Sequence, residues 1–207
     1  MYAEAPGSSD AAEPETMTVA GGPGVGVVTG VTSGIGLAAA RALVRAGVEL
    51  SVVARDPVRL AAVLAELQAR AVAPVEGYLA DLARLKETER VAEEIREAHP
   101  QLNLLINNAG AIFTRRHATE EGIERTLALN VLTPFQLTRT LLPALRASPG
   151  ARVVNVASAA HAWGSIHFDD LEGRRRYGGW RAYAQSKLAL ILLTQEFARR
   201  EPGRRVT

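Results

Sequence analysis

Tyr183 and Lys187 are the residues of this sequence whose types and spacing most directly suggest chemistry. They lie four residues apart in an apolar run without Gly or Pro, which predicts a helix over 180–200 with both side chains on one face. An ammonium held beside a phenol favours the phenolate, so such a pair can exchange a proton with a carbonyl or alcohol near neutral pH. The alternative is a helix with one amphipathic Tyr and one Lys that reaches solvent.

Composition favours a specific task for Lys187. The chain has 24 Lys and Arg residues in total, but only Lys86 and Lys187 are lysines. In so arginine-rich a chain, a lysine suggests that a compact ammonium is needed where a guanidinium would not serve.

A glycine-rich turn, Thr29-Gly-Val-Thr-Ser-Gly-Ile-Gly36, joins a predicted strand to a predicted helix. Glycines at this place let the backbone approach a pyrophosphate, and the helix N-terminus favours the anion. The lysine of a phosphate-binding P-loop is absent. The turn therefore predicts nucleotide binding, the alternative being a turn that only closes the strand–helix unit.

The second predicted strand ends in Arg55 and Asp56. An acidic residue at this tip binds a ribose 2′-hydroxyl, whereas an arginine accommodates a 2′-phosphate. Because Asp56 precedes Pro57 and is a candidate helix cap, Arg55 favours NADP over NAD. The alternative is that Arg55 is a solvated loop charge.

Strand and helix patterns alternate along the chain, which predicts an α/β fold with a parallel sheet covered on both faces. The predicted strands are residues 25–29, 50–54, 72–79, 102–106 and 152–157. The predicted helices are 34–46, 57–70, 82–98, 120–146 (interrupted or bent by Pro134 and Pro143) and 180–200. Residues 1–22 lack apolar periodicity and are predicted to be a disordered tail before one domain over 23–207.

Three further segments complete a known pattern: Asn107-Asn108-Ala109-Gly110 after the fourth strand, Asn130 in the long helix, and Ser158 at the end of the fifth strand. With the glycine turn and Tyr-x-x-x-Lys in this order, the chain strongly resembles the short-chain dehydrogenase/reductase family over about 25–200. Residues 167–171 and 182–189 are similar to its retinol-dehydrogenase-like and WW-domain-oxidoreductase-like branch.

The resemblance implies a role for each catalytic residue. Tyr183 would be the general acid in carbonyl reduction and the base in alcohol oxidation, and Lys187 would bind the nicotinamide ribose and favour the phenolate. Ser158 would hydrogen-bond the substrate oxygen, and Asn130 would hold a helix distortion and a relay water. Ser158 as a plain strand end is the alternative reading. His161 and His167 receive no role.

The resemblance also implies a cofactor site. Its expected residues are Gly30, Ser33, Gly34, Ile35 and Gly36 at the pyrophosphate, Arg55 at the 2′-phosphate, Asp81 and Leu82 at the adenine, and Asn108, Ala109 and Gly110 at the adjoining ribose, with Tyr183 and Lys187 beside them. Two alternatives are that Asp81 only caps a helix and that Asn107 ties the sheet together.

The implied fold is a doubly wound parallel sheet (Rossmann fold) with strand order 3-2-1-4-5, lacking the usual last strands. Residues 204–207 resemble only the start of a sixth strand, so we expect an open edge on the fifth strand, partly covered apolar residues on the 180–200 helix, and self-association. The implied reaction is reversible hydride transfer between NADP(H) and a small-to-medium apolar carbonyl or alcohol. The alternative is a nucleotide-binding protein without turnover, because much of the substrate pocket would be missing.

Composition argues against other classes of protein. The sequence has no cysteine, which excludes disulfides and thiolate zinc sites, and no metal-binding constellation is evident. A net charge of +2, short basic clusters and 5% aromatic residues argue against nucleic-acid binding. Neither a membrane span nor a signal-peptide pattern is found, so a cytoplasmic location is expected.

Overall fold

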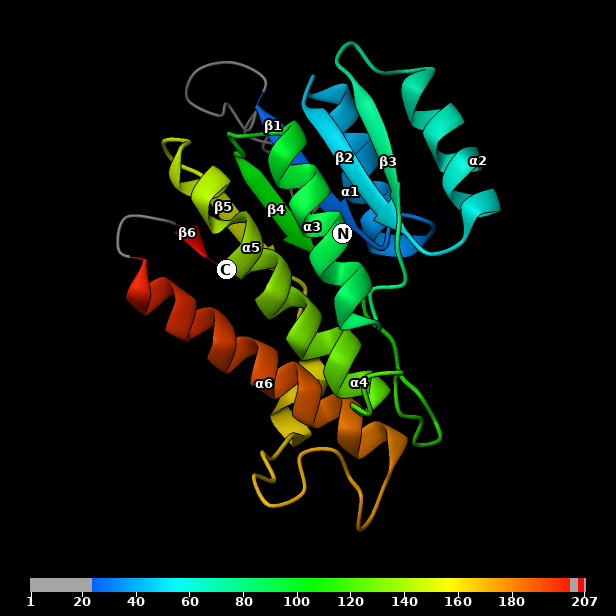
Figure 1. Ribbon diagram of the computed structural model, residues 1–207, viewed down its shortest axis with the longest axis vertical. Coiled ribbons are helices and arrows are strands. Elements are labelled where there is room, and N and C mark those ends of the chain that lie inside the picture. The colour runs from blue at the N-terminus through cyan, green and yellow to red at the C-terminus, as the bar shows by residue number, and fades with distance from the viewer. Residues whose placement is uncertain (1–23, 202–204, 207) are drawn as a thin grey trace, which may run out of the picture.

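Short runs of Val, Leu and Ile form the strands, because a strand with helices on both faces is apolar on both sides. The computed structural model describes residues 24–201 and 205–206. Its strands are β1 Val25–Thr29, β2 Glu49–Ala54, β3 Val75–Leu79, β4 Leu104–Asn107, β5 Arg152–Asn155 and β6 Arg205–Val206. They form one parallel sheet in the order β3-β2-β1-β4-β5-β6 (Figure 1), which confirms the predicted order 3-2-1-4-5. The predicted tail, residues 1–22, lies outside the described residues.

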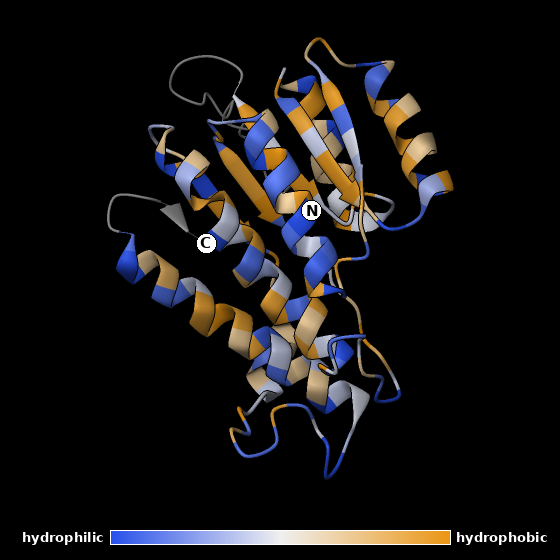
Figure 2. Cartoon of the chain, viewed as in Figure 1, coloured by the Kyte–Doolittle hydropathy of each residue, from blue (hydrophilic) through white to orange (hydrophobic). Residues whose placement is uncertain are grey.

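Helices cover the two faces of the sheet. They are α1 Gly34–Arg45, α2 Pro57–Gln68, α3 Leu85–Ala98, α4 Arg125–Leu127, the π-helical turn η1 Ala128–Leu132, α5 Thr133–Arg146, the 3₁₀ turn η2 Ala159–Trp163 and α6 Gly179–Arg200. Figure 1 shows α3 and α5 in front of the sheet and α1 behind it. The strands are mostly orange in Figure 2, whereas the helices carry both colours, as expected for elements with one buried face.

Two hydrophobic clusters hold these layers together. Val27 of β1 packs with α3 and α5, and its neighbour Val28 packs with α1 and α2 on the opposite face. Successive strand side chains point to opposite faces, so each strand contributes to both clusters. Both valines are fully buried.

Several predicted boundaries are wrong at their ends. β3 begins at Val75 and not at residue 72, because Pro74 precedes it, and β5 ends at Asn155 and not at 157. α3 begins at Leu85, since a turn in which Asp81 accepts from the Ala83 N–H at 3.1 Å occupies the predicted start. β4 spans Leu104–Asn107, two residues later than predicted at its start.

The predicted helix over 120–146 is wrong in its first part. The helix begins at Arg125. The π-helical turn η1 contains Asn130, which confirms the helix distortion that the family resemblance placed there. Pro134 lies in the first turn of α5, directly after η1, and α5 continues through Pro143.

The expected open edge of β5 is also wrong in part. β6 pairs with β5 in parallel, placing Arg205 opposite Arg152 and Val206 opposite Val153. The expectation for α6 is confirmed, because Leu192 remains 48% exposed and Leu188 and Ile191 are only partly buried.

Candidate active site

A cleft of about 980 Å³ opens where β1, β2, β4 and β5 end. Carboxyl ends of parallel strands meet at one edge of a sheet, so loops that are distant in the sequence line one space. The predicted residues that line this cleft are Gly30, Ser33, Gly34, Ile35, Arg55, Asp81, Leu82, Asn108, Ala109, Gly110, Ser158, Tyr183 and Lys187. Gly36 and Asn130 are not part of the lining.

Gly36 lies beneath the glycine turn and permits a close contact. A Cβ added there would lie 2.4 Å from both the Asn108 Nδ2 and the Gly30 carbonyl oxygen. Gly30 has φ +72° and a Cβ on it would lie 2.9 Å from the Ala109 Cα. The turn therefore packs directly on the segment that follows β4.

Asn108 holds this contact from the other side. Its Nδ2 donates to the carbonyl oxygens of Thr29, at 2.9 Å, and Gly30, at 3.1 Å. The Thr29 hydroxyl in turn accepts from the N–H groups of Asn108 and Ala109, each at 3.0 Å. Thr29 was not among the predicted site residues, and only the pairing of β1 with β4 brings it here.

The N-terminus of α1 faces the cleft with its charge uncompensated. Ser33 is the N-cap, its side chain caps no backbone group, and the first turn contains no acidic residue. Ser33, Gly34 and Ile35 all line the cleft, and Ile35 is 68% exposed. Free N–H groups and the positive end of the helix dipole favour an anion at this place.

One arginine lies at the tip of β2 and a second lies in the first turn of α2. Arg55 and Arg59 both line the cleft, and within residues 24–201 and 205–206 neither side chain has an ion pair or hydrogen bond. Asp56 is occupied as the N-cap of α2, where its Oδ1 accepts from the N–H groups of Val58 and Arg59 at 3.0 Å, so its predicted capping role is confirmed. Arg59 was missed because it lies one turn inside α2.

Asp81 and Leu82 form the opposite wall. Besides closing the turn before α3, Asp81 lies with its Oδ2 3.7 Å from the Arg125 Nη2. The Arg125 guanidinium lies 4.8 Å from the centre of the Phe113 ring, and Phe113 lines the cleft. Phe113 is a further cleft residue that the sequence alone did not indicate.

Lys187 is the buried charge of the cleft, with 5% of its surface exposed. Its Nζ donates to the Val156 carbonyl oxygen at 2.7 Å and lies 5.7 Å from the centre of the Tyr183 ring. Burial lowers the pKa of Lys187 below its ordinary value. Tyr183 is half-buried, one turn earlier on α6, with its ring in the cleft.

Ser158 reaches the cleft from the loop after β5. It is the N-cap of η2, and its Oγ accepts from the Ala160 N–H at 3.2 Å. Its carbonyl oxygen lies 2.8 Å from the His161 Nδ1. The residue therefore begins a 3₁₀ turn and does not simply end the strand.

Asn130 lies behind the cleft wall in η1. Its Oδ1 accepts from the Ala111 N–H and its Nδ2 donates to the Ala111 carbonyl and to the Ser186 Oγ, all at 3.0 Å. A Cβ on Gly110 would lie 3.3 Å from the Asn130 Oδ1 and 3.4 Å from the Lys187 Nζ. Asn130 thus fixes the backbone at residues 110–111 beside Lys187.

Asn107 ties the sheet together, as its alternative reading predicts. The side chain is 3% exposed, and its Nδ2 donates to Thr138 on α5 and to Asn155 on β5. It takes no part in the lining of the cleft.

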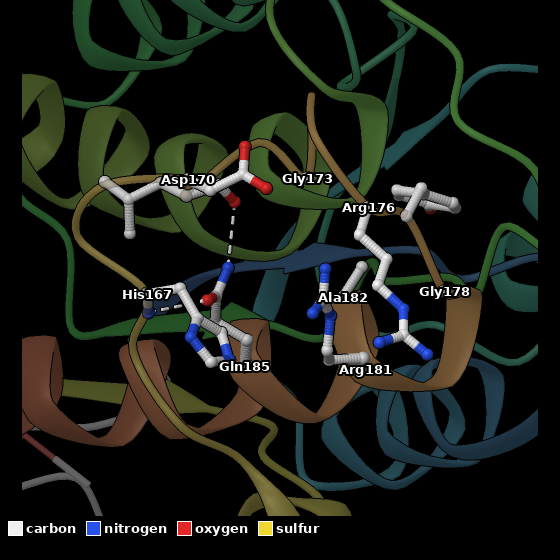
Figure 3. A pocket seen from close by; sticks show the side chains of 10 residues that line it. His167, Asp170, Gly173, Arg176, Gly178, Arg181, Ala182 and Gln185 are labelled. Atoms are coloured by element: carbon white, nitrogen blue, oxygen red, sulfur yellow. Dashed lines mark hydrogen bonds between the residues drawn. The ribbon is translucent and has the colours of Figure 1, made fainter.

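A second, much smaller pocket lies between the start of α6 and the segment before it (Figure 3). Its volume of about 10 Å³ is room for roughly one water. Gln185 accepts from the His167 N–H at 3.0 Å and donates to the Leu171 carbonyl at 2.8 Å, which fastens this segment to α6. The pocket is too small for a substrate.

Comparison with known proteins identifies the family. The profile described as short chain dehydrogenase matches residues 25–207. The chain belongs to the short-chain dehydrogenase/reductase family. It is 43% identical to the polyprenol dehydrogenase of Mus musculus over 84% of this chain, and 40% identical to retinol dehydrogenase 12 of Bos taurus over 87%. These relatives support the predicted retinol-dehydrogenase-like branch.

A solved structure agrees with this family assignment. The short-chain dehydrogenase from Sphingobium yanoikuyae, in complex with NADPH, is 31% identical and has a TM-score of 0.70 over 86% of this chain and 65% of that chain. The chain spans 54% of the length of the polyprenol dehydrogenase and 58% of that of the retinol dehydrogenase. In the described part of the chain, no helix is long and apolar enough to cross a membrane, and no cluster of His, Asp and Glu could hold a metal ion.

Proposed function

We propose that this short-chain dehydrogenase/reductase transfers a hydride reversibly between NADP(H) and the carbon of a carbonyl or alcohol. The observation that carries the proposal is the convergence of Ser158, Tyr183 and Lys187 in the same cleft that receives the glycine turn and Arg55. A phosphate-binding end and a proton-donating end in one cleft suit a dinucleotide beside a carbonyl substrate.

The cleft suits the cofactor in shape and charge. Gly30 and Gly36 leave no room for a side chain, so backbone can approach a pyrophosphate at the N-terminus of α1. Among the residues that the structure describes, the guanidinium groups of Arg55 and Arg59 have no partner, which suits a 2′-phosphate and supports NADP over NAD. Asp56, which could otherwise accept from a ribose hydroxyl, already caps α2.

In the proposed reduction, bound NADPH supplies the hydride to the carbonyl carbon. The Tyr183 phenol gives its proton to the carbonyl oxygen, yielding the alcohol, while the Ser158 hydroxyl donates a hydrogen bond to the same oxygen. Burial lowers the pKa of Lys187, so its ammonium can more readily return a proton to the phenolate. Asn130 holds Gly110 and Ala111 beside Lys187. Oxidation of an alcohol reverses each of these steps.

Replacing Tyr183 tests the proposal. In Tyr183→Phe the ring keeps its packing but has no proton to transfer, so turnover of NADPH with a panel of aldehydes and ketones should fall about 10²–10⁴-fold. The dissociation constant of NADPH should change little. Tyr78→Phe on β3 is the matched control and should keep wild-type turnover, because Tyr78 does not line the cleft.

The same measurements separate the rival function. A protein that only binds the nucleotide would bind NADPH and consume none with any carbonyl of the panel. Wild-type turnover in Tyr183→Phe would remove Tyr183 from the mechanism.

A further inference from the structure

The two tryptophans of the chain stand in one row with Tyr183. Trp180 lies three residues before Tyr183 on α6, and their ring centres are 6.1 Å apart. Trp163, at the end of η2, lies with its ring centre 6.4 Å from that of Trp180. The sequence contains no other tryptophan. Trp180 therefore lies next to the proposed proton donor, and Trp163 lies next to Trp180.

Neither tryptophan side chain is part of the hydrophobic core. Trp163 is 69% exposed and Trp180 is 57% exposed. A large aromatic ring left in solvent stabilises the fold little, and an exposed group of such rings beside a cleft is typical of binding surfaces. Among the described residues, the two indole rings therefore contribute little to the core.

The row is held in a fixed position. A Cβ on Gly164 would lie 2.6 Å from the Ala184 carbonyl oxygen, so the residue after Trp163 presses on α6. Gln185 fastens the following segment through His167 and Leu171 (Figure 3). Near Trp180, a Cβ on Gly179 would lie 2.5 Å from the Phe113 carbonyl oxygen. A preorganised surface loses little conformational entropy on binding.

The order of residues along α6 decides which ligand meets the row. Lys187 follows Tyr183 and lies beside Gly110, on the side of the proposed cofactor site, whereas Trp180 precedes Tyr183 on the opposite side. Trp163 and Trp180 do not line the cleft itself but adjoin its Tyr183 end, so the body of a carbonyl compound whose oxygen meets Tyr183 can extend away from Lys187 towards the two indole rings.

We infer that Trp163 and Trp180 form the substrate-body subsite and select carbonyl compounds, or the corresponding alcohols, that carry a flat aromatic ring. This rests on the proposed function. A flat ring can stack or pack edge-to-face on an indole, with a gain beyond the area it buries. A saturated ring of the same size gains only the burial of apolar area.

Benzaldehyde and cyclohexanecarbaldehyde test the inference, because they share a carbon skeleton and differ in the flatness of the ring. Tryptophan emission reports only Trp163 and Trp180, so binding of each aldehyde can be titrated on the whole protein in the presence of NADP⁺, without turnover. We expect benzaldehyde to change the emission and to bind more tightly. In Trp163→Leu and Trp180→Leu its dissociation constant should rise about two- to tenfold, and that of cyclohexanecarbaldehyde should rise less.

Phe135→Leu is the matched control, because Phe135 is an exposed ring, at 41%, that pairs with Phe197 away from the row. It should leave both dissociation constants unchanged. Two results would overturn the inference. One is an equal rise in the dissociation constants of both aldehydes in the tryptophan variants, and the other is no change of emission with benzaldehyde. Self-association in sedimentation that both leucine variants abolish without a change in aldehyde preference would also overturn it. A ring preference in binding without any turnover would support the subsite while rejecting the proposed function.

Discussion

A buried ammonium is the least ordinary single group in the cleft. Lys187 is 5% exposed and its hydrogen-bond partner is a neutral carbonyl, so it keeps a charge where solvation is poor. Arg55 is the opposite case, since its guanidinium is exposed at the rim and lies beside Arg59 in the lining. Each cation has a distinct physical consequence that can be measured.

Lys187→Met should change how stability depends on pH. Burial lowers the pKa of Lys187 in the folded state below its ordinary 10.5, so the unfolded chain binds the proton more tightly. Below the lowered pKa, burial of the Lys187 ammonium reduces the free energy of unfolding of the wild type by its full amount. This reduction disappears as pH rises towards 10.5. Urea unfolding should show that the free energy of unfolding of the variant, relative to the wild type, is higher at pH 7. This difference should shrink as pH approaches 10.5.

Lys86→Met is the control, because Lys86 is the other lysine of the chain and is exposed. It should leave the pH dependence of the free energy of unfolding unchanged. If the stability difference between Lys187→Met and the wild type grew with pH, it would contradict a buried ammonium at Lys187.

Arg55→Ala should weaken NADPH more than NADH. Only NADPH carries the 2′-phosphate, and a hydrogen bond to a charged group contributes about 1.5–3 kcal/mol. Both dissociation constants should be measured at one salt concentration. Arg45→Ala, on α1 and outside the cleft lining, is the matched control. Equal losses for the two cofactors would contradict the assignment of Arg55 to the 2′-phosphate.

At the scale of elements, the cleft depends on contacts between loops that follow different strands. The turn after β1 touches the segment after β4 through Gly36 and Asn108, and η1 holds that segment through Asn130. The π-helical turn places Asn130 where both amide atoms meet the Ala111 backbone. A substitution that displaces one of these loops should therefore also displace the loop packed against it.

Gly36→Ala tests this coupling. The new methyl group would overlap the Gly30 carbonyl oxygen and the Asn108 amide, and overpacking of this kind costs about 1–3 kcal/mol. We expect a lower melting temperature and weaker NADPH binding together. Gly178→Ala is the control, since its methyl group would meet nothing nearer than the Arg181 Cβ at 3.8 Å. Unchanged NADPH affinity in Gly36→Ala would show that the turn and the segment after β4 are not coupled.

At the scale of the whole molecule, the last strand that the structure describes at one side of the sheet is very short. β6 pairs with only Arg152 and Val153 of β5, and α6 keeps apolar side chains such as Leu192 partly in solvent. Unpaired strand edges and exposed apolar faces favour association between copies of a chain.

Deleting residues 202–207 should increase that association. Without β6, the edge of β5 would present unpaired N–H and C=O groups, so sedimentation should show larger species and the melting temperature should fall by a few degrees, about 2–4 °C per kcal/mol lost. Deleting residues 1–22 is the control and is expected to leave the melt unchanged, because the apolar residues of that segment are mostly alanines without periodicity and offer too little apolar surface to pack. Equal behaviour of the two deletions would mean that β6 does not protect the sheet.

The sequence by itself determined the alternation of strands and helices, the glycine turn, the Asp56 cap and the Tyr183–Lys187 pair, because each depends on local patterns of a few residues. The strand order followed only from the family resemblance that the joint motifs carry. The errors of the sequence-based predictions include the predicted helix start at residue 120, where Glu124 instead caps the helix and its N–H donates to the distant Glu172, and the start of β3, which the local Pro74 delays. Only the tertiary structure decided that Arg59 and Phe113 enter the cleft, that Asn108 holds the glycine turn, and that Trp163 lies beside Trp180. The physical reason is that parallel strands bring loops together from distant parts of the chain, and no local pattern records which side chains then meet.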